Sequence, residues 1–375
     1  DVYKRQIFAV MGICFAANMF TLFLFYEILT LSTYPLVAHK GDPLSVSGAR
    51  VYLGILLGTS IVFLLTGLIW TYALVGHLDF VAGGILNGKI AVGLLPILLG
   101  LYAFGIGKAA LMPLHRWLPA AMVAPTPVSA LLHAVAVVKA GVFTMLKVGV
   151  YIFGIDFLAE SGASQWLIWL AAISIILASL FALMQNNLKK RLAYSTVSQL
   201  SYVTLAMALA TPMAAMGGGM QIAMHAFGKI ALFMCAGAIY VVTKKTDVSE
   251  LSGLGRKMPI TFIIFAIASF SIIGLPPFGG SWPKFLLILG AVDTGYFSII
   301  AVLMISSLLN VAYLLPIVGR GFFVKSKDGL DLKLIHEAPL LCWLPAAIAA
   351  GTCLLLFFYA GLIQDFLRPF AQGSI

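Results

Sequence analysis

Residues 214–243 read AAMGGGMQIAMHAFGKIALFMCAGAIYVVT, and their only formal charge is Lys229, close to the midpoint. A helix of about 20 apolar residues crosses the hydrocarbon core of a bilayer, so this stretch predicts a transmembrane helix. A charged side chain at the centre of such a helix costs at least ~2.5–3.5 kcal/mol. The stretch therefore predicts a membrane protein and a lysine that has a function inside the membrane.

The whole chain has the same character as this segment. Of its 375 residues, 62% are apolar and 10% are charged, whereas soluble domains have about 45–50% and about 25%. The mean hydropathy of +1.06 excludes a soluble enzyme with one anchor, and it excludes a disordered chain. The apolar runs are too long for barrel strands, so we expect an all-α polytopic membrane protein. Ten runs are candidate transmembrane helices: 7–38, 51–76, 90–110, 127–153, 165–186, 191–210, 214–243, 259–288, 296–319 and 340–363.

The net charge of +10 is carried by short basic clusters between the apolar runs. Nucleic-acid binding requires a folded basic face, so we predict no nucleic-acid partner. With ten crossings, one side of the membrane collects fourteen basic residues: Lys40, Arg50, Arg116, Lys189, Lys190, Arg191, Lys244, Lys245, Arg256, Lys257, Arg320, Lys325, Lys327 and Lys333. Basic loops are retained in the cytoplasm, so we expect this side to be cytoplasmic and both termini to lie on the outer face.

Titratable side chains recur inside the other spans. They are Glu27, Lys108, His133, Lys139, His225 and Lys284. One such lysine could reach the interface with its long side chain, but several in one chain indicate a buried polar path. Lysine, glutamate and histidine can exchange protons when their surroundings tune them. His225 and Lys229 are four residues apart and share a helix face, whereas His133 and Lys139 are six apart and point in different directions.

The residue types in the spans argue against a metal or a cofactor. A self-contained sodium site would favour carboxylates and carbonyl groups, but four lysines accompany one carboxylate in the spans. The four cysteines lie in apolar runs without CxxC spacing, and the sequence has no haem, iron–sulfur or dinucleotide motif. We therefore expect no metal site, no cofactor and no catalytic residues in this chain.

Two segments predict interrupted helices. Residues 105–119 and 274–284 each combine glycine, proline and a lysine within an apolar run. Proline removes a backbone donor and clashes with the preceding turn, so we expect breaks at Pro113 and at Pro276 and Pro277. Interrupted helices in the two halves of a transporter often mark the ion path. The lysine beside each break favours that interpretation over a simple kink.

Six stretches of the sequence resemble a known family of membrane proteins. They are Phe25-Tyr26-Glu27, Gly107–Pro119, Pro125–His133, Lys190–Gln199, His225–Lys229 and Gly274–Lys284. The family is that of the antiporter-like proton-translocating subunits. It includes the D-type subunit of Mrp sodium/proton antiporters, the antiporter-like subunits of respiratory complex I, which is an NADH:quinone oxidoreductase, and related subunits of membrane-bound hydrogenases. The resemblance covers almost the whole chain.

The resemblance implies a fold of fourteen helices that contains two inverted five-helix repeats. Glu27 matches the glutamate of the family's fifth helix, so we expect an N-terminally truncated chain that lacks the first four helices. Residues 1–153 would then form the first half-channel repeat without its opening helix, and residues 165–319 the second repeat. Residues 320–375 would form a cytoplasmic loop and the C-terminal transmembrane helix.

The resemblance also implies roles for the buried titratable residues. Glu27 matches the glutamate that modulates a neighbouring lysine, and Lys108 matches that lysine, on the first broken helix. Lys229 matches the central-axis lysine, and Lys284 matches the lysine of the second broken helix, toward the exit.

Three further positions complete the implied proton relay. His133 matches a relay histidine on the eighth helix. Lys139 lies where some members carry lysine and others a neutral residue. His225 lies on the same helix face as Lys229, where it would continue the water chain.

The implied function is that of a proton-translocating subunit in a multisubunit monovalent cation (sodium)/proton antiporter of a bacterial inner membrane. The stretches Phe25–Val37 and Gly274–Gly280 look closer to the D-type Mrp subunit than to other branches. An antiporter-like subunit of NADH:quinone oxidoreductase or of a membrane-bound hydrogenase is the alternative, in which redox chemistry would reside in partner subunits. A passive structural membrane subunit is the alternative of another class. The expected partners are other membrane subunits, the lipid bilayer, protons and, for the antiporter, sodium.

Overall fold

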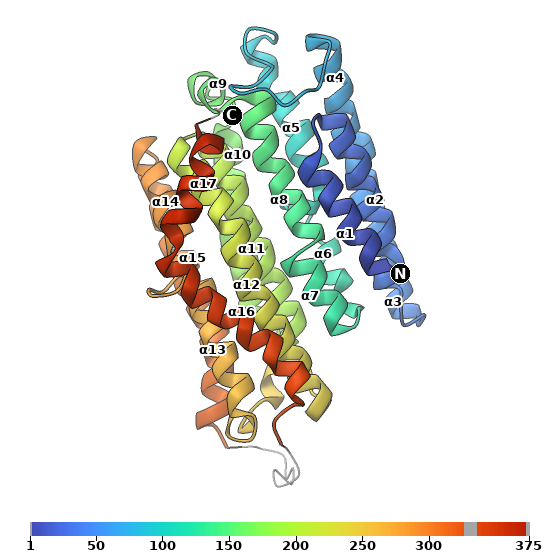
Figure 1. Ribbon diagram of the computed structural model, residues 1–375, viewed down its shortest axis with the longest axis vertical. Helices are drawn as coiled ribbons and strands as arrows, with labels where there is room; N and C mark the ends of the chain where they lie inside the picture. Colours follow the sequence, from blue (N-terminus) through green and yellow to red (C-terminus); the bar gives the residue numbers. More distant parts are fainter. Residues whose placement is uncertain (1, 326–335, 373–375) are drawn as a thin grey trace.

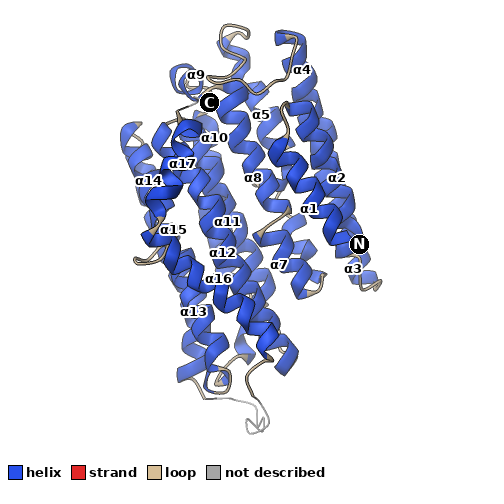
Figure 2. Ribbon diagram, viewed as in Figure 1, coloured by secondary structure: helices blue, strands red, loops and turns tan. Residues whose placement is uncertain are grey.

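The computed structural model describes residues 2–325 and 336–372, and helices are the only regular elements within those ranges (Figure 2). They pack side by side in one elongated bundle (Figure 1). Among the described residues, seven helices are long and apolar enough to cross a membrane, and two shorter apolar helices cover 92–105 and 259–273. The expectation of an all-α polytopic membrane protein is confirmed. Lys327 and Lys333 of the predicted cytoplasmic side lie outside the described residues.

The first predicted span, 7–38, is two helices instead of one. α1 (Val2–Phe15) and α2 (Met19–Val37) form an antiparallel hairpin, in which Gln6 Nε2 donates to Thr33 Oγ1 over 2.7 Å. A long apolar run is compatible with one tilted helix, so composition alone did not reveal the turn between the two.

The hairpin reverses the predicted position of the chain start. The beginning of α1 lies beside the end of α2, on the side of Lys40, whereas α17 (Ala360–Ala371) ends at the opposite end of the bundle (Figure 1). The prediction that both termini share one face is therefore wrong, because α1 adds one crossing to the ten. Lys4 and Arg5 consequently join the basic side, which we call the basic end of the bundle.

We call α1 to α9, up to Ser161, the first half of the bundle, and its remaining helices are α3 to α9. They are α3 (Pro43–Thr59), α4 (Leu65–Val75), α5 (Leu95–Gly105), α6 (Trp117–Ala120), α7 (Thr126–Ala134), α8 (Val137–Val148) and α9 (Ile155–Ser161). A π-helical turn joins α3 to α4, so that residues 43–75 form one long crossing.

The second half is built around two central helices. It comprises α10 (Gln165–Met184), α11 (Leu188–Leu209), α12 (Pro212–Thr243), α13 (Pro259–Ile273), α14 (Ser281–Asp293), α15 (Phe297–Phe323), α16 (Leu340–Phe358) and α17. α11 is buried along almost its whole length and packs between α10 and α12. Its many serine and threonine side chains therefore face protein rather than lipid, which fits its absence from the seven long apolar helices although 191–210 is one of the ten predicted spans.

Both predicted helix breaks are confirmed. The first separates α5 from α6 and contains Pro113, and the second separates α13 from α14 and contains Pro276 and Pro277. Pro113 and Pro277 each follow a cis peptide bond. A third break, at residues 135–136, separates α7 from α8. It has no sequence signal, because neither glycine nor proline marks it.

The last two helices, α16 and α17, run diagonally across the second half and form what we call the C-terminal strap (Figure 1). Two hydrogen bonds join the strap to the second break and to the first turn of α14, which follows it. The Gly279 amide donates to the Cys353 carbonyl oxygen over 2.8 Å, and the Trp282 indole donates to the Phe357 carbonyl oxygen over 3.0 Å.

The residues that lead into the strap are anchored to the start of α13. The Glu337 carboxylate accepts hydrogen bonds from the Ile260 amide over 2.9 Å and from Thr261 Oγ1 over 2.5 Å. An acidic side chain at a helix N-terminus satisfies free amides and complements the helix dipole.

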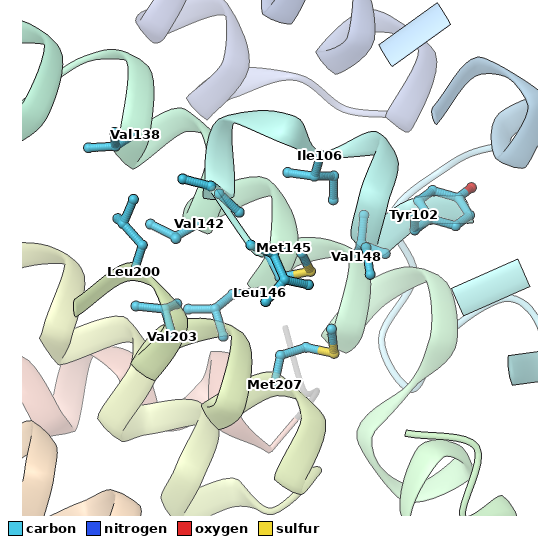
Figure 3. Packing of buried hydrophobic residues seen from close by; sticks show 14 of the residues in the cluster. Tyr102, Ile106, Val138, Val142, Met145, Leu146, Val148, Leu200, Val203 and Met207 are labelled. Carbon is cyan, nitrogen blue, oxygen red and sulfur yellow. The ribbon is translucent and has the colours of Figure 1, made fainter. Parts of the chain in front are cut away.

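Apolar side chains form the contact layer between α8 and α11. In Figure 3, Val138, Val142 and Leu146 of α8 lie against Leu200 and Val203 of α11. All five side chains are buried, so the contact between these helices is apolar along this face.

Gly141 allows α8 to approach the first helix break. A Cβ atom at this position would lie closer than 3.0 Å to the backbone of Lys108 and Ala109. Overpacking of this kind costs about 1–3 kcal/mol. We therefore expect Gly141→Ala to lower the thermal unfolding midpoint in detergent by several degrees.

The matched control is Gly54→Ala on α3, where a Cβ atom meets nothing within 4 Å. Alanine favours a helix over glycine by roughly 0.5–1 kcal/mol, so this midpoint should stay unchanged or rise. Equal midpoints for the two variants would contradict the close approach at Gly141.

Candidate functional site

Lys108 lies in the first helix break and is completely buried. Its ammonium group donates to the Tyr26 carbonyl oxygen over 2.8 Å and to Thr30 Oγ1 over 2.6 Å. The Lys108 amide also donates to the Tyr26 hydroxyl over 3.1 Å. The break therefore directs this lysine onto α2 rather than toward lipid.

Glu27 follows Tyr26 on α2 and lies near this lysine without touching it. Both carboxylate oxygens of Glu27 are buried and have no hydrogen-bond partner among the described residues. The carboxylate interacts electrostatically with Lys108, but no ion pair within 4.0 Å joins them in the described part of the chain. The modulation of Lys108 by Glu27 therefore stays a prediction.

Lys139 and His225 form a direct contact that the sequence did not predict. Lys139 lies in the first turn of α8, directly after the third break, and His225 lies on α12. The Lys139 ammonium nitrogen and His225 Nδ1 are 2.7 Å apart. His225 Nε2 is buried without a partner in the described chain, and the ring borders a narrow gap that Gln199 and Gln221 also line.

Lys229 is completely buried at the centre of α12. Its ammonium group donates to Ser195 Oγ over 2.7 Å and to the Leu192 carbonyl oxygen over 3.3 Å. Ser195 Oγ is in turn 2.7 Å from the Tyr313 hydroxyl, which donates to Asn310 Oδ1 over 2.5 Å. Neutral groups of α11 and α15 therefore hold this central lysine. It shares a helix face with His225 as expected, but no hydrogen bond between their side chains is present in the described residues.

His133 lies between the basic end and Lys229. Both ring nitrogens are buried without a hydrogen-bond partner among the described residues, and the ring centroid is 4.9 Å from that of Phe233. The ring interacts electrostatically with Lys229 and with Lys189. Lys189 is at the basic end, where its ammonium group donates to the Ala124 carbonyl oxygen over 2.6 Å.

Lys284 lies on α14, directly after the second break. Its ammonium group donates to the carbonyl oxygens of Ile273, over 2.6 Å, and Ile272, over 3.2 Å, and to Ser307 Oγ over 3.0 Å. The last carbonyl groups of a helix have no partner within it. The break thus supplies the acceptors that this lysine needs.

The predicted site residues gather into three buried clusters. The first cluster holds Glu27 and Lys108, the central cluster holds His133, Lys139, His225 and Lys229, and the third cluster holds Lys284 with its carbonyl acceptors. Electrostatic interactions connect the members of the central cluster. Among the described residues, no direct hydrogen bond joins site residues of different clusters, and no group of three histidine, cysteine or acidic side chains could hold a metal ion.

Sequence reasoning missed the neutral partners of the lysines. Tyr26 and Thr30 are four residues apart on α2, so that both face Lys108. Ser195 and Tyr313 together hold Lys229 in place. Polar side chains at helical spacing within apolar runs were the available signal, but nothing in the sequence assigns each of them to a particular lysine.

The sequence matches a described family and two kinds of relative. Residues 16–310 match the family described as NADH:quinone oxidoreductase/Mrp antiporter, transmembrane. NADH-quinone oxidoreductase subunit N of Desulforudis audaxviator is 33% identical over 322 residues, which cover 84% of this chain and 62% of that protein. The A/B subunit of a probable K(+)/H(+) antiporter of Rhizobium meliloti is 32% identical over 384 residues, which cover 98% of this chain and 36% of that protein. The chain thus spans less than two thirds of the length of either relative.

Solved structures share the fold. A chain of the Mrp complex from Dietzia sp. DQ12-45-1b superposes with a TM-score of 0.87 at 23% identity, covering 99% of this chain and 76% of that chain. A chain of the membrane-bound sulfane sulfur reductase, an archaeal respiratory membrane complex, superposes with a TM-score of 0.86 at 25% identity, covering 100% and 75%. Both neighbours are subunits of multisubunit membrane complexes. The broken helices, the buried lysines and the sequence match agree, and this chain belongs to the NADH:quinone oxidoreductase/Mrp antiporter transmembrane family.

Proposed function

We propose that this chain is a proton-translocating subunit of a multisubunit monovalent cation (sodium)/proton antiporter. The observation that carries the proposal is the set of four buried lysines, each of which is held by neutral groups. A buried charge without a counter-charge is costly, and a buried lysine exchanges its proton more readily than an exposed one. A passive structural subunit would have no reason to retain four of them.

In the proposed relay, protons enter from the basic end near Lys189 and reach Lys229 by way of His133. The contact between Lys139 and His225 connects this central part with α8 and the first half, where Glu27 modulates Lys108. Lys284, beside the second break, leads toward the exit. Water between the three clusters completes the path, since grouped polar side chains can be bridged by ordered water.

We further propose that residues 1–153 and 165–319 are two inverted repeats. α1 runs away from the basic end and α10 runs toward it, so corresponding helices of the two segments have opposite directions. We propose that α1, which the hairpin adds, is the opening helix of the first segment, so that this segment has five crossings. In each segment the fourth crossing is a broken helix with a lysine, Lys108 or Lys284.

A subunit of an NADH:quinone oxidoreductase is the second candidate. The relative from Desulforudis audaxviator supports it, because that relative is named as subunit N of such an enzyme and is 33% identical. In this case redox chemistry would belong to partner subunits. The assignment to the D-type Mrp subunit stays a prediction, since the antiporter relatives are named as A and A/B subunits. Cation-dependent proton flux without added NADH would favour the antiporter.

Removal of a buried lysine tests the proposal in the assembled complex. We expect Lys108→Ala, Lys229→Ala and Lys284→Ala each to lower cation-dependent proton flux in vesicles roughly a hundredfold, the lower end of the contribution of a positioned proton-transfer group. The matched control is Lys325→Ala, which removes an exposed lysine of the basic end that lies outside the relay and the clusters. Co-purification of the partner subunits should be unchanged in all four variants. Full flux in an assembled Lys229→Ala complex would instead favour a structural subunit.

The contact between Lys139 and His225 tests the route through the central cluster. If the two side chains act as one step, the Lys139→Ala and His225→Ala substitutions should be strongly non-additive, so that the double variant loses little more flux than either single variant. In the control pair, His225→Ala and Lys108→Ala change residues of different clusters, so their losses of flux should be closer to additive. Additive losses for Lys139 and His225 would exclude a shared step.

The position of the two chain ends tests the orientation. We propose that the basic end faces the cytoplasm of a bacterial inner membrane, because basic loops are retained there. In a cysteine-free background, Asp365→Cys should react with an impermeant maleimide added outside intact cells. Lys4→Cys should react only after permeabilisation. Labelling of both positions from outside would contradict the hairpin topology.

A further inference from the structure

A cleft of about 1030 Å³ opens at the basic end of the bundle. It lies between α7, α12 and the start of α16, and the segments that precede α3 and α11 border its mouth. Its volume is at the upper end of the roughly 300–1,000 Å³ that is common for ligand sites. None of the seven predicted relay residues lines it, and although the proposed proton entry near Lys189 lies at its mouth, no step of the proposed path uses its apolar depth.

The mouth of the cleft is positively charged. Four lysines border it, Lys40, Lys189, Lys190 and Lys245, against one acidic side chain, Asp42. The Asp42 carboxylate already caps α3 by accepting a hydrogen bond from a backbone amide. Lys40 and Lys190 are exposed. The charge around the mouth therefore favours an anionic group.

Apolar side chains line the deep part of the cleft. Ala130 and Leu131 of α7 and Ile230 and Met234 of α12 line its walls. From Ile230 to the end of α12 the helix rises roughly 20 Å, whereas one leaflet of the hydrocarbon core is about 15 Å thick. The cleft is therefore long enough for a head group at the lysines and a hydrocarbon chain below them. Leu341, at its rim, is 83% exposed, so the cleft is continuous with apolar surface.

We propose that this cleft binds one anionic phospholipid, with its phosphate among the lysines of the mouth and an acyl chain along α7 and α12. Basic pockets between transmembrane helices on the cytoplasmic side suit anionic lipid head groups, because the phosphate is attracted to lysines at the height of the membrane surface. A soluble anion would leave the apolar depth exposed to water. The helix of a neighbouring subunit would lack the phosphate that complements the four lysines.

The test is photo-labelling of the intact complex in vesicles. The probes are phosphatidylglycerol and phosphatidylcholine that carry a diazirine on one acyl chain, and the labelled peptides are mapped by mass spectrometry. We expect the phosphatidylglycerol probe to label peptides that contain Leu131 and Met234 roughly tenfold more than the phosphatidylcholine probe. The double variant Lys40→Gln, Lys190→Gln should reduce this labelling to the phosphatidylcholine level.

A second double variant, Lys257→Gln with Lys325→Gln, is the matched control. It removes the same charge from the same end of the bundle, but neither lysine lines the cleft, so the preference for phosphatidylglycerol should persist. Equal labelling by both lipids, or equal loss in both double variants, would overturn the proposal. So would protection of the cleft from both probes in the complex with labelling regained after dissociation, since a neighbouring subunit would then fill it.

Discussion

A buried ammonium group that no carboxylate neutralises has to be held by the dipoles of carbonyl and hydroxyl groups, and this requirement shapes the interior of the protein. At the second break, α13 ends so that the carbonyl groups of Ile272 and Ile273 face Lys284. At the centre, α11 presents Ser195 to Lys229. A hydroxyl or carbonyl partner lowers the cost of burying the charge without fixing it as strongly as a carboxylate would. The lysines are thereby kept inside the bundle, and the proposed relay requires that they can still lose a proton.

The same requirement explains why polar side chains gather in separate clusters. Between them the bundle is packed with apolar side chains, as the layer between α8 and α11 shows (Figure 3). Close packing leaves few gaps in such layers. In the proposed relay, a proton that moves from one cluster to the next would therefore need either an intervening water molecule or a change in side-chain position. Lys139 and His225 are important in this respect, because their contact joins α8 to α12 across the boundary between the two halves.

Much of the fold could be predicted from the sequence, because apolar length and proline have direct structural consequences. The spans, both proline-containing breaks and the burial of Lys108, Lys229 and Lys284 follow from these signals. The turn between α1 and α2 did not, since an apolar run does not reveal where it reverses. The break before Lys139 has no proline or glycine, and the contact of Lys139 with His225 depends on packing between helices 86 residues apart. Pairings of this kind are determined by tertiary structure, which helical spacing alone does not describe.

The C-terminal strap connects the second break with the start of α13 through hydrogen bonds. Its helix α16 is bonded to the chain just before Lys284 through Gly279 and Trp282, and the residues that precede it are tied by Glu337 to the start of α13. α16 has 19 residues and is roughly 28 Å long, so it extends from near the start of α13 at the basic end to the break beside Lys284. A displacement of the backbone beside Lys284 would therefore either break these hydrogen bonds or move α16, and a movement of α16 would reach the start of α13 at the basic end.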